Sequence, residues 1–127
     1  MIVIDTSALL AIVLRESEAA ECIAALQSET EILMSAGTLA EALIVSARRR
    51  VADEMLRLFD VLTIEIEPVT PASAKRVAQA YEQWGRGFHP AGLNFGDCFA
   101  YALAKECSCP LLFIGNDFAK TDVKSAL

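Results

Sequence analysis

Four acidic residues stand beside predicted strand ends, although they are far apart in the sequence. Asp5 directly follows the apolar run 2–4, and Glu41 comes one turn into the helix after the second predicted strand. Asp97 begins the helix that leads to the last predicted strand, and Asp117 follows that strand. Because the carboxyl ends of parallel strands meet at one edge of a sheet, we expect the four side chains to converge there.

Helix capping explains each acid singly. Thr38 and Glu41 match the pattern of a capping box, and Asn94 and Asp97 form a similar arrangement. The other two acids can accept hydrogen bonds at a helix start or in an Asx turn. Capping gives no reason for all four acids to fall at the same edge of the sheet, so convergence calls for a further explanation.

A shared divalent cation is that explanation. Four carboxylates that converge without a cation repel one another and raise one another's pKa values. Carboxylate oxygens with no accompanying cluster of His or Cys favour Mg²⁺ or Mn²⁺ over Zn²⁺. Such a cation polarises a phosphoryl group and activates water, which is the chemistry of phosphodiester hydrolysis.

Motifs of other phosphate chemistries are missing from the sequence. It contains neither a GxGxxG nor a GxxxxGK[ST] loop, which weighs against nucleotide-cofactor enzymes. A haloacid-dehalogenase phosphatase needs an acid two residues after Asp5, where Ser7 stands. A receiver domain needs an acid after the third strand and a lysine after the last one, and Pro68 and Gly115 stand nearby. The lone His89 lies in a loop and is expected to be a surface residue.

Apolar periodicity predicts the elements that must carry the acids. Strands are expected at 2–4, 31–34, 63–66 and 111–114, and helices at 8–14, 16–27, 38–49, 51–61, 71–84 and 94–106, with a long loop at 85–92. Alternating strands and helices predict an α/β fold, a three-layer α/β/α sandwich with a mostly parallel central sheet. With 127 residues and no linker, residues 1–127 are expected to form a single domain.

Composition narrows the class of protein. The net charge of −6 weighs against a general nucleic-acid coat protein, and the 54% hydrophobic content suggests that a partner covers apolar surface. The longest apolar run, 8–14, is too short to span a membrane, and no basic segment precedes it. The four cysteines lack zinc-site spacing, so we expect reduced thiols and a cytoplasmic location.

These motifs together resemble the PIN-domain ribonucleases, in particular the VapC toxins of type II VapBC toxin–antitoxin systems. The matching segments are 3–8, Glu41, 93–98 and 112–118 with Thr121 and Asp122. The resemblance implies a PIN fold and an Mg²⁺-dependent endoribonuclease, with Mn²⁺ as a substitute, that cleaves RNA phosphodiester bonds by metal-activated water. It also implies a VapB-type antitoxin partner and a homodimer.

The same resemblance implies roles for individual residues. Asp5 and Asp97 become the principal catalytic metal ligands, Glu41 a ligand or the group that orients the attacking water, and Asp117 the fourth acid of the site. The fourth position stays open among three residues of the closing segment: Asn116, Asp117 and Asp122. Thr6, Ser7 and Asn116 are expected to support the ligands.

Arginines outside the acidic site are the candidates for contacts with the RNA backbone. They are Arg15, Arg48, Arg49, Arg50 and Arg86. For the run 48–50, a solvated helix C-terminus favoured by the helix dipole explains the same residues.

Two other functions remain open. The chain could be a non-catalytic PIN-like interaction module whose acids merely cap helices, or a metal-dependent small-molecule phosphatase. Saturable binding of Mg²⁺ or Mn²⁺ separates the nuclease from the interaction module, and hydrolysis of a generic phosphate monoester identifies the phosphatase.

Overall fold

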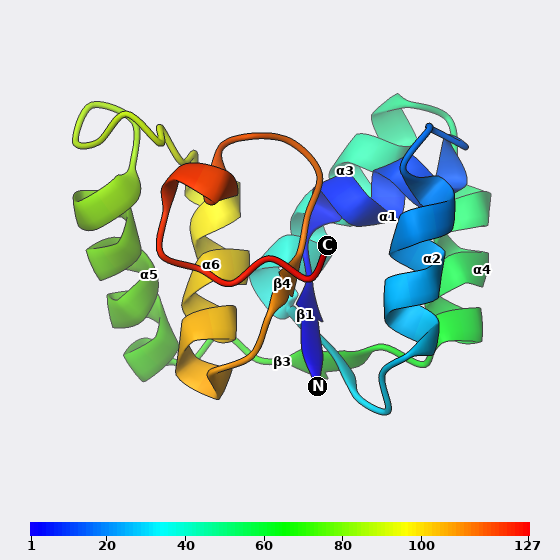
Figure 1. Cartoon of the computed structure of the whole chain (residues 1–127), viewed down its shortest axis with the longest axis horizontal. Helices are drawn as coiled ribbons and strands as arrows, with labels where there is room; N and C mark the ends of the chain where they lie inside the picture. Colours follow the sequence, from blue (N-terminus) through cyan, green and yellow to red (C-terminus); the bar gives the residue numbers. More distant parts are fainter.

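A parallel sheet of four strands forms the centre of the computed structural model, which describes residues 1–127 (Figure 1). The strand order is β3-β2-β1-β4, so the first strand of the chain lies inside the sheet. Val3 pairs with Leu33 on one side and with Leu111 on the other. The strands are β1 (Ile2–Ile4), β2 (Ile32–Ser35), β3 (Glu65–Glu67) and β4 (Leu111–Leu112).

Helices cover both faces of this sheet, which confirms the predicted α/β/α sandwich. Figure 1 shows α5 and α6 on one side and α1, α2 and α4 on the other. The helices are α1 (Thr6–Val13), α2 (Ala19–Gln27), α3 (Ala36–Arg48), α4 (Ala52–Leu62), α5 (Pro71–Trp84) and α6 (Phe95–Cys107), with a short 3₁₀ helix η1 (Phe118–Lys120).

Alternation along β1 divides the apolar side chains between two cores. Val3 belongs to the core under α5 and α6, whereas Ile2 and Ile4 belong to the core under α1 and α4. All three side chains are essentially inaccessible to solvent. Each such buried side chain contributes about 1.5–3 kcal/mol to stability, so β1 is a rigid support for the residue that follows it, Asp5.

The third helix of the chain begins earlier than the sequence predicts. Its N-cap is Ser35, whose side chain accepts a hydrogen bond from the Gly37 backbone N–H. Thr38 therefore lies inside the first turn, and the predicted capping box of Thr38 with Glu41 is wrong. The reason is that the end of β2 supplies a capping serine three residues before Thr38, which leaves Glu41 without a capping role.

Smaller differences from prediction concern the ends of elements. The third strand lies at 65–67 and forms one edge of the sheet, and the last strand is only two residues long. None of the helices is both long enough and apolar enough to cross a lipid bilayer. The four cysteines are all unpaired, and Cys22 and Cys98 are buried.

Candidate active site

Three of the predicted acids come together beyond the carboxyl end of β1. Asp5 lies between β1 and α1, Glu41 lies in α3, and Asp97 lies in the first turn of α6. The charges of Glu41 and Asp97 both raise the pKa of Asp5, and the charge of Asp117 raises that of Asp97. The four acids therefore share one neighbourhood, as the strand-end pattern predicts.

One carboxylate oxygen of Asp5 accepts hydrogen bonds and the other has no partner. Its Oδ2 accepts hydrogen bonds from the Ser7 backbone N–H at 3.0 Å and from Ser7 Oγ–H at 2.6 Å. Ser7 Oγ in turn accepts a hydrogen bond from the Ile114 backbone N–H at 3.0 Å, which joins α1 to the end of β4. Asp5 Oδ1 is buried and has no hydrogen-bond partner. An oxygen in that state is costly unless a ligand completes it.

The environment of Asp5 disfavours its charged form. Burial is the main cause and raises the pKa of Asp5 from 3.8 to about 6, despite the opposing hydrogen bonds from Ser7. The charges of Asp97 and Glu41 are smaller causes of the same rise. The side chain is only 3% exposed, so solvent does little to relieve the cost.

Asp97 forms the predicted capping box with Asn94. The Asp97 backbone N–H donates to Asn94 Oδ1 at 2.8 Å, and the Asn94 backbone N–H donates to Asp97 Oδ2 at 3.0 Å. Burial raises the pKa of Asp97, the hydrogen bond from Asn94 lowers it, and the charges of Glu41 and Asp117 raise it again. Asp97 thus combines a structural role in α6 with a place among the acids.

Glu41 lies directly against the backbone of the helix that carries Asp97. A Cβ atom added to Gly96 would overlap Glu41 Oε2. Only glycine leaves room for this carboxylate beside Asp97, and the sequence analysis missed this role of Gly96. The position of Gly96 immediately before a predicted site acid is the signal that could have indicated it.

In the closing segment, the charge of Asp117 acts on Asp97, whereas Asp122 binds other residues. Asp117 is exposed and makes no capping hydrogen bond at the start of η1. Asp122 is bound elsewhere, because Tyr101 OH donates to its Oδ1 and Lys105 Nζ donates to its Oδ2. Of the three residues left open for the fourth position, Asp122 is therefore already engaged by its neighbours, whereas Asp117 and the adjacent Asn116 are exposed.

The supporting residues differ in what they contact. Ser7 binds Asp5 directly, as described above. Thr6 is buried and its Oγ1–H donates to the Thr38 backbone carbonyl at 3.4 Å, which links the starts of α1 and α3. Thr6 therefore fixes the start of α1, which Asp5 caps, against α3, which carries Glu41.

The acid cluster suits a hard cation, although its side chains are not arranged as a complete cage. No group of three or more His, Cys, Asp or Glu side chains is placed to hold a metal ion directly. Asp97 is turned toward its cap, and Asp5 offers one free oxygen. The donors are all carboxylate oxygens, which fit Mg²⁺ or Mn²⁺, and the unpaired Asp5 Oδ1 is where such an ion would satisfy the structure.

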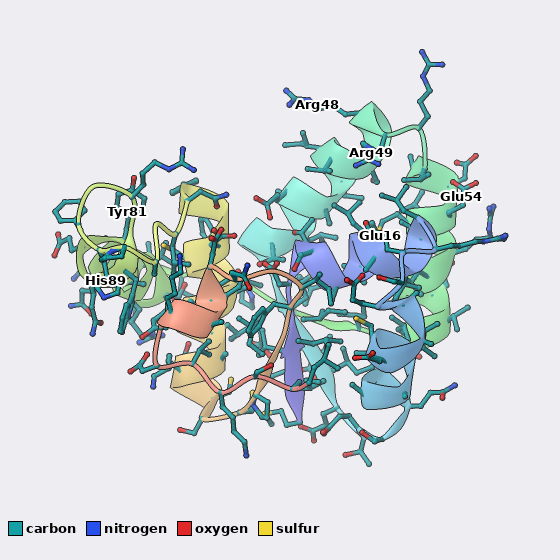
Figure 2. All side chains as sticks on the ribbon, turned by 45° about the horizontal axis from the view of Figure 1, so that its top comes forward. Glu16, Arg48, Arg49, Glu54, Tyr81 and His89 are labelled. Atoms are coloured by element: carbon teal, nitrogen blue, oxygen red, sulfur yellow. The ribbon has the colours of Figure 1, made fainter.

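Of the five candidate arginines, only Arg86 is among the charges that shift the pKa of Asp5 or Asp97. The charge of Arg86 lowers the pKa of Asp97, opposing the neighbouring carboxylates. Arg48 and Arg49 project from the far end of α3 (Figure 2). Arg48 is seven residues beyond Glu41, or about 10 Å along the helix axis.

The other two arginines occupy turns at helix ends. Arg15 and Arg50 are exposed and have positive φ values of 55° and 58°. Arg15 follows α1 and Arg50 follows α3, so both belong to the surface at the ends of those helices. Neither is among the charges that shift the pKa of Asp5 or Asp97.

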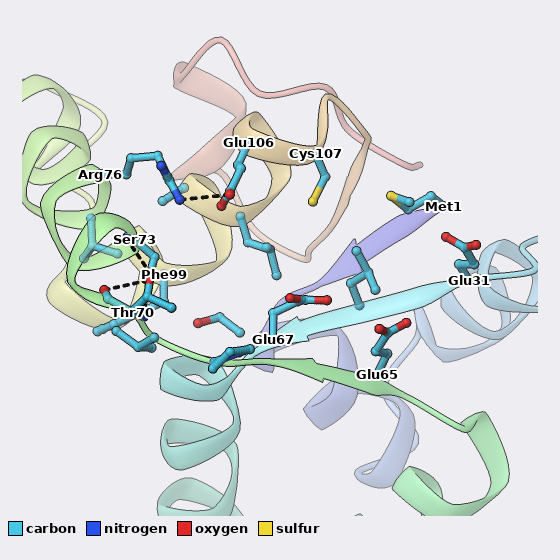
Figure 3. A pocket seen from close by; sticks show the side chains of 17 residues that line it. Met1, Glu31, Glu65, Glu67, Thr70, Ser73, Arg76, Phe99, Glu106 and Cys107 are labelled. Atoms are coloured by element: carbon cyan, nitrogen blue, oxygen red, sulfur yellow. Dashed lines mark hydrogen bonds and ion pairs between the residues drawn. The ribbon is translucent and has the colours of Figure 1, made fainter.

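A separate hollow of about 430 Å³ lies between the sheet and the helices α5 and α6 (Figure 3). Glutamates Glu31, Glu65, Glu67 and Glu106 line it, and Arg76 binds Glu106 at 2.8 Å. None of the four acids discussed above lines this hollow. Its glutamates therefore serve as controls for the removal of a carboxylate outside the candidate site.

Known proteins resemble this chain over nearly its whole length. A family model described as "PIN domain" matches residues 2–124. The chain is 41% identical to "Ribonuclease VapC28" of Mycobacterium tuberculosis over 129 residues, which cover 98% of this chain and 97% of that protein.

Solved structures share the fold at lower sequence identity. Mycobacterium tuberculosis VapC20, described as a sarcin-ricin loop cleaving toxin, has a TM-score of 0.76 with 17% identity, covering 97% of this chain and 96% of that one. A toxin–antitoxin complex from Klebsiella pneumoniae has a TM-score of 0.70 with 18% identity, covering 96% and 93%. Both similarities concern the fold.

Proposed function

The chain belongs to the PIN domain family, and on that premise we propose that it is a VapC ribonuclease, the toxin of a VapBC toxin–antitoxin system. Its 41% identity to ribonuclease relatives extends over nearly the whole length of both chains. The observation that carries the proposal for this chain's own residues is the unpaired, buried Asp5 Oδ1 beside two further carboxylates.

Asp5, Glu41, Asp97 and Asp117 are the residues that would hold Mg²⁺, with Mn²⁺ as a substitute. A bound Mg²⁺ supplies Lewis-acid polarisation of a phosphodiester and makes attacking water more acidic. Support comes from the donor chemistry, because four carboxylates and no imidazole or thiolate suit a hard cation. Support also comes from the electrostatics, because a cation would relieve the repulsion that raises the pKa values of Asp5 and Asp97.

Ser7, Glu41 and Asp97 have different roles in the proposed site. Ser7 fixes Asp5 Oδ2, so that Oδ1 keeps one direction toward the site. Glu41 does not cap a helix, and its carboxylate lies against Gly96. It is therefore suited to orient the water that attacks the phosphorus or to accept a proton from it. Asp97 caps α6 through Oδ2 alone, so its Oδ1 is available to the cation.

Arg86 is the arginine that we assign to the RNA backbone next to the scissile bond. Its positive charge acts on Asp97, and it is exposed at the start of the loop that follows α5. An arginine there would bind a phosphate beside the acids, where an otherwise acidic surface repels RNA. Contacts to Arg15 and to the run 48–50 would involve more distant parts of the RNA.

Partners of two kinds follow from the same proposal: a VapB-type antitoxin and a second copy of the chain. The Klebsiella pneumoniae structure that shares this fold is a toxin–antitoxin complex. Several large apolar side chains are exposed, which supports covered surfaces in the functional assembly. They include Ile23, Leu43, Ile44, Leu56, Val61, Phe88 and Phe95.

Cleavage of RNA by the purified chain tests the activity. Total RNA is incubated with the protein and Mg²⁺, and the new 5′ and 3′ ends are sequenced. We expect discrete cuts that chelator abolishes and that Asp5→Asn and Asp97→Asn both remove. Glu65→Gln, which removes a carboxylate from the separate hollow, should cleave like the unaltered chain. Cleavage that survives chelator, or survives both site substitutions, contradicts the proposal.

The hydrogen bonds of Asp5 and Asp97 favour one competing function, a non-catalytic interaction module. Both acids cap helices, which is the only role that acids have in such a module. Capping does not account for Glu41 or Asp117, neither of which caps its helix. A module of this kind would show no saturable binding of Mg²⁺ or Mn²⁺ and no RNA cleavage.

A further inference from the structure

The side chain of Asp117 lies in the exposed turn after β4 and makes no capping hydrogen bond. Gly115, with φ of 107°, turns the chain away from β4, and both Asn116 and Asp117 are exposed. The nearest firm contact is that of Phe118, which is buried and packs its ring against Phe113 with the ring centres 5.1 Å apart. The position of Asp117 therefore depends on how the rest of this segment is held.

A hydrogen-bonded chain of side chains holds the far end of the segment. Trp84 Nε1–H donates to Tyr101 OH at 2.8 Å, and Tyr101 OH donates to Asp122 Oδ1 at 2.5 Å. Lys105 Nζ donates to the other oxygen, Oδ2, at 3.1 Å. A tyrosine hydroxyl has one proton, and Trp84 can only donate, so that proton is directed to Asp122.

The geometry of α6 relates this anchor to the acids. Asp97, Tyr101 and Lys105 follow one another at intervals of four residues, which places them along one face of the helix. Asp117 interacts with Asp97, and Asp122 binds the two residues one and two turns further on. The segment is thus fixed to α6 at Asp122, and Asp117 lies near enough to Asp97 for its charge to raise the pKa of Asp97.

We infer that Tyr101 is a positioning residue, which acts through its hydrogen bond to Asp122 to keep Asp117 beside Asp97. The inference rests on the proposed cation site. Asp97 and Asp117 repel each other when no cation is bound, and an exposed segment would yield to that repulsion by moving outward. The buried Tyr101, 5% exposed, resists this movement because its ring is fixed in the core. Asp117 thereby stays beside Asp97 before a cation arrives, which favours binding.

Tyr101→Phe tests this role, because it removes the hydroxyl and keeps the buried ring. Mn²⁺ binding is measured by isothermal titration calorimetry on the full chain. Loss of a partner outside the ligands themselves weakens metal binding by roughly 10-fold to 100-fold, and we expect about 10-fold here. Asp122→Asn should weaken binding in the same direction. The matched control is Tyr81→Phe, the same change at the only other tyrosine, whose hydroxyl is in none of these hydrogen bonds.

A double substitution separates positioning from a general loss of structure. If Tyr101 acts through Asp117, Tyr101→Phe should weaken Mn²⁺ binding in the unaltered chain and have no further effect in an Asp117→Asn background. A further loss in that background, or unchanged binding by Tyr101→Phe alone, overturns the inference while leaving the proposed nuclease intact. Failure of the unaltered chain to bind Mn²⁺ overturns the proposed cation site and, with it, this role of Tyr101.

Discussion

Replacing Asp5 with asparagine should stabilise the metal-free protein at neutral pH. Asn caps helices as well as Asp does, so the hydrogen bonds from Ser7 can be retained. The substitution removes a buried negative charge that faces Glu41 and Asp97. The Asp5 carboxylate, which we propose holds the cation, is thus expected to destabilise the protein when no cation is present.

The structure gives the size and the pH window of this effect. A pKa of about 6 in place of 3.8 corresponds to about 3 kcal/mol at a pH above both values. The buried N–H₂ group of the asparagine offsets part of this stabilisation, because it has to find a hydrogen-bond acceptor. We therefore expect the free energy of unfolding to rise by about 1–3 kcal/mol in total. Between pH 4 and 6 the folded protein binds more protons at Asp5 than the unfolded chain does. This group therefore lowers the free energy of unfolding as pH rises through that window.

Urea unfolding in the presence of chelator measures the difference, at pH 4 and at pH 7.5. We expect Asp5→Asn to match the unaltered chain at pH 4 and to exceed it at pH 7.5. The exposed-site control Glu65→Gln should change the free energy of unfolding by less than about 0.5 kcal/mol at either pH. The reasoning is refuted if Asp5→Asn is the less stable protein at pH 7.5, or if its advantage is equal at both pH values.

Three further substitutions probe the contacts around the acids. Gly96→Ala pushes the Glu41 carboxylate aside, so we expect RNA cleavage to fall at least about 10-fold while the melting temperature changes little, since only the end of a flexible side chain must move. Ser7→Ala leaves the Ile114 backbone N–H without its acceptor, and urea unfolding should show a loss of about 1–3 kcal/mol. Arg86→Gln should weaken binding of single-stranded RNA and reduce the slope of log affinity against log salt by about 1, whereas Arg86→Lys should keep most of that slope. An unchanged cleavage rate, an unchanged stability and an unchanged salt slope would contradict the three assignments respectively.

The sequence predicted the layers and the meeting of the acids because both depend on local patterns. Apolar runs indicate buried strands, and a parallel sheet brings the ends of its strands to one edge. The sequence alone therefore predicts that Asp5 and Asp97 lie in one neighbourhood. Their capping hydrogen bonds were predicted as well, because caps depend on residues only two or three positions away.

Contacts between distant segments could not be predicted in this way. The overlap of Gly96 with Glu41 depends on the distance between α3 and α6, and no local pattern sets that distance. The hydrogen bond of Tyr101 to Asp122 likewise depends on the path of the chain after β4. The start of α3 was misplaced for a different reason, because two nearby residues, Ser35 and Thr38, both suit an N-cap, and the end of β2 decided between them.

Calorimetric titration of the full chain with Mn²⁺ tests most directly whether these dispersed carboxylates hold a common ion. We predict saturable binding by the unaltered chain and by Glu65→Gln, and its loss in Asp97→Asn. Heats that never saturate, or an Asp97→Asn isotherm that superimposes on that of the unaltered chain, would mean that the four carboxylates hold no common ion.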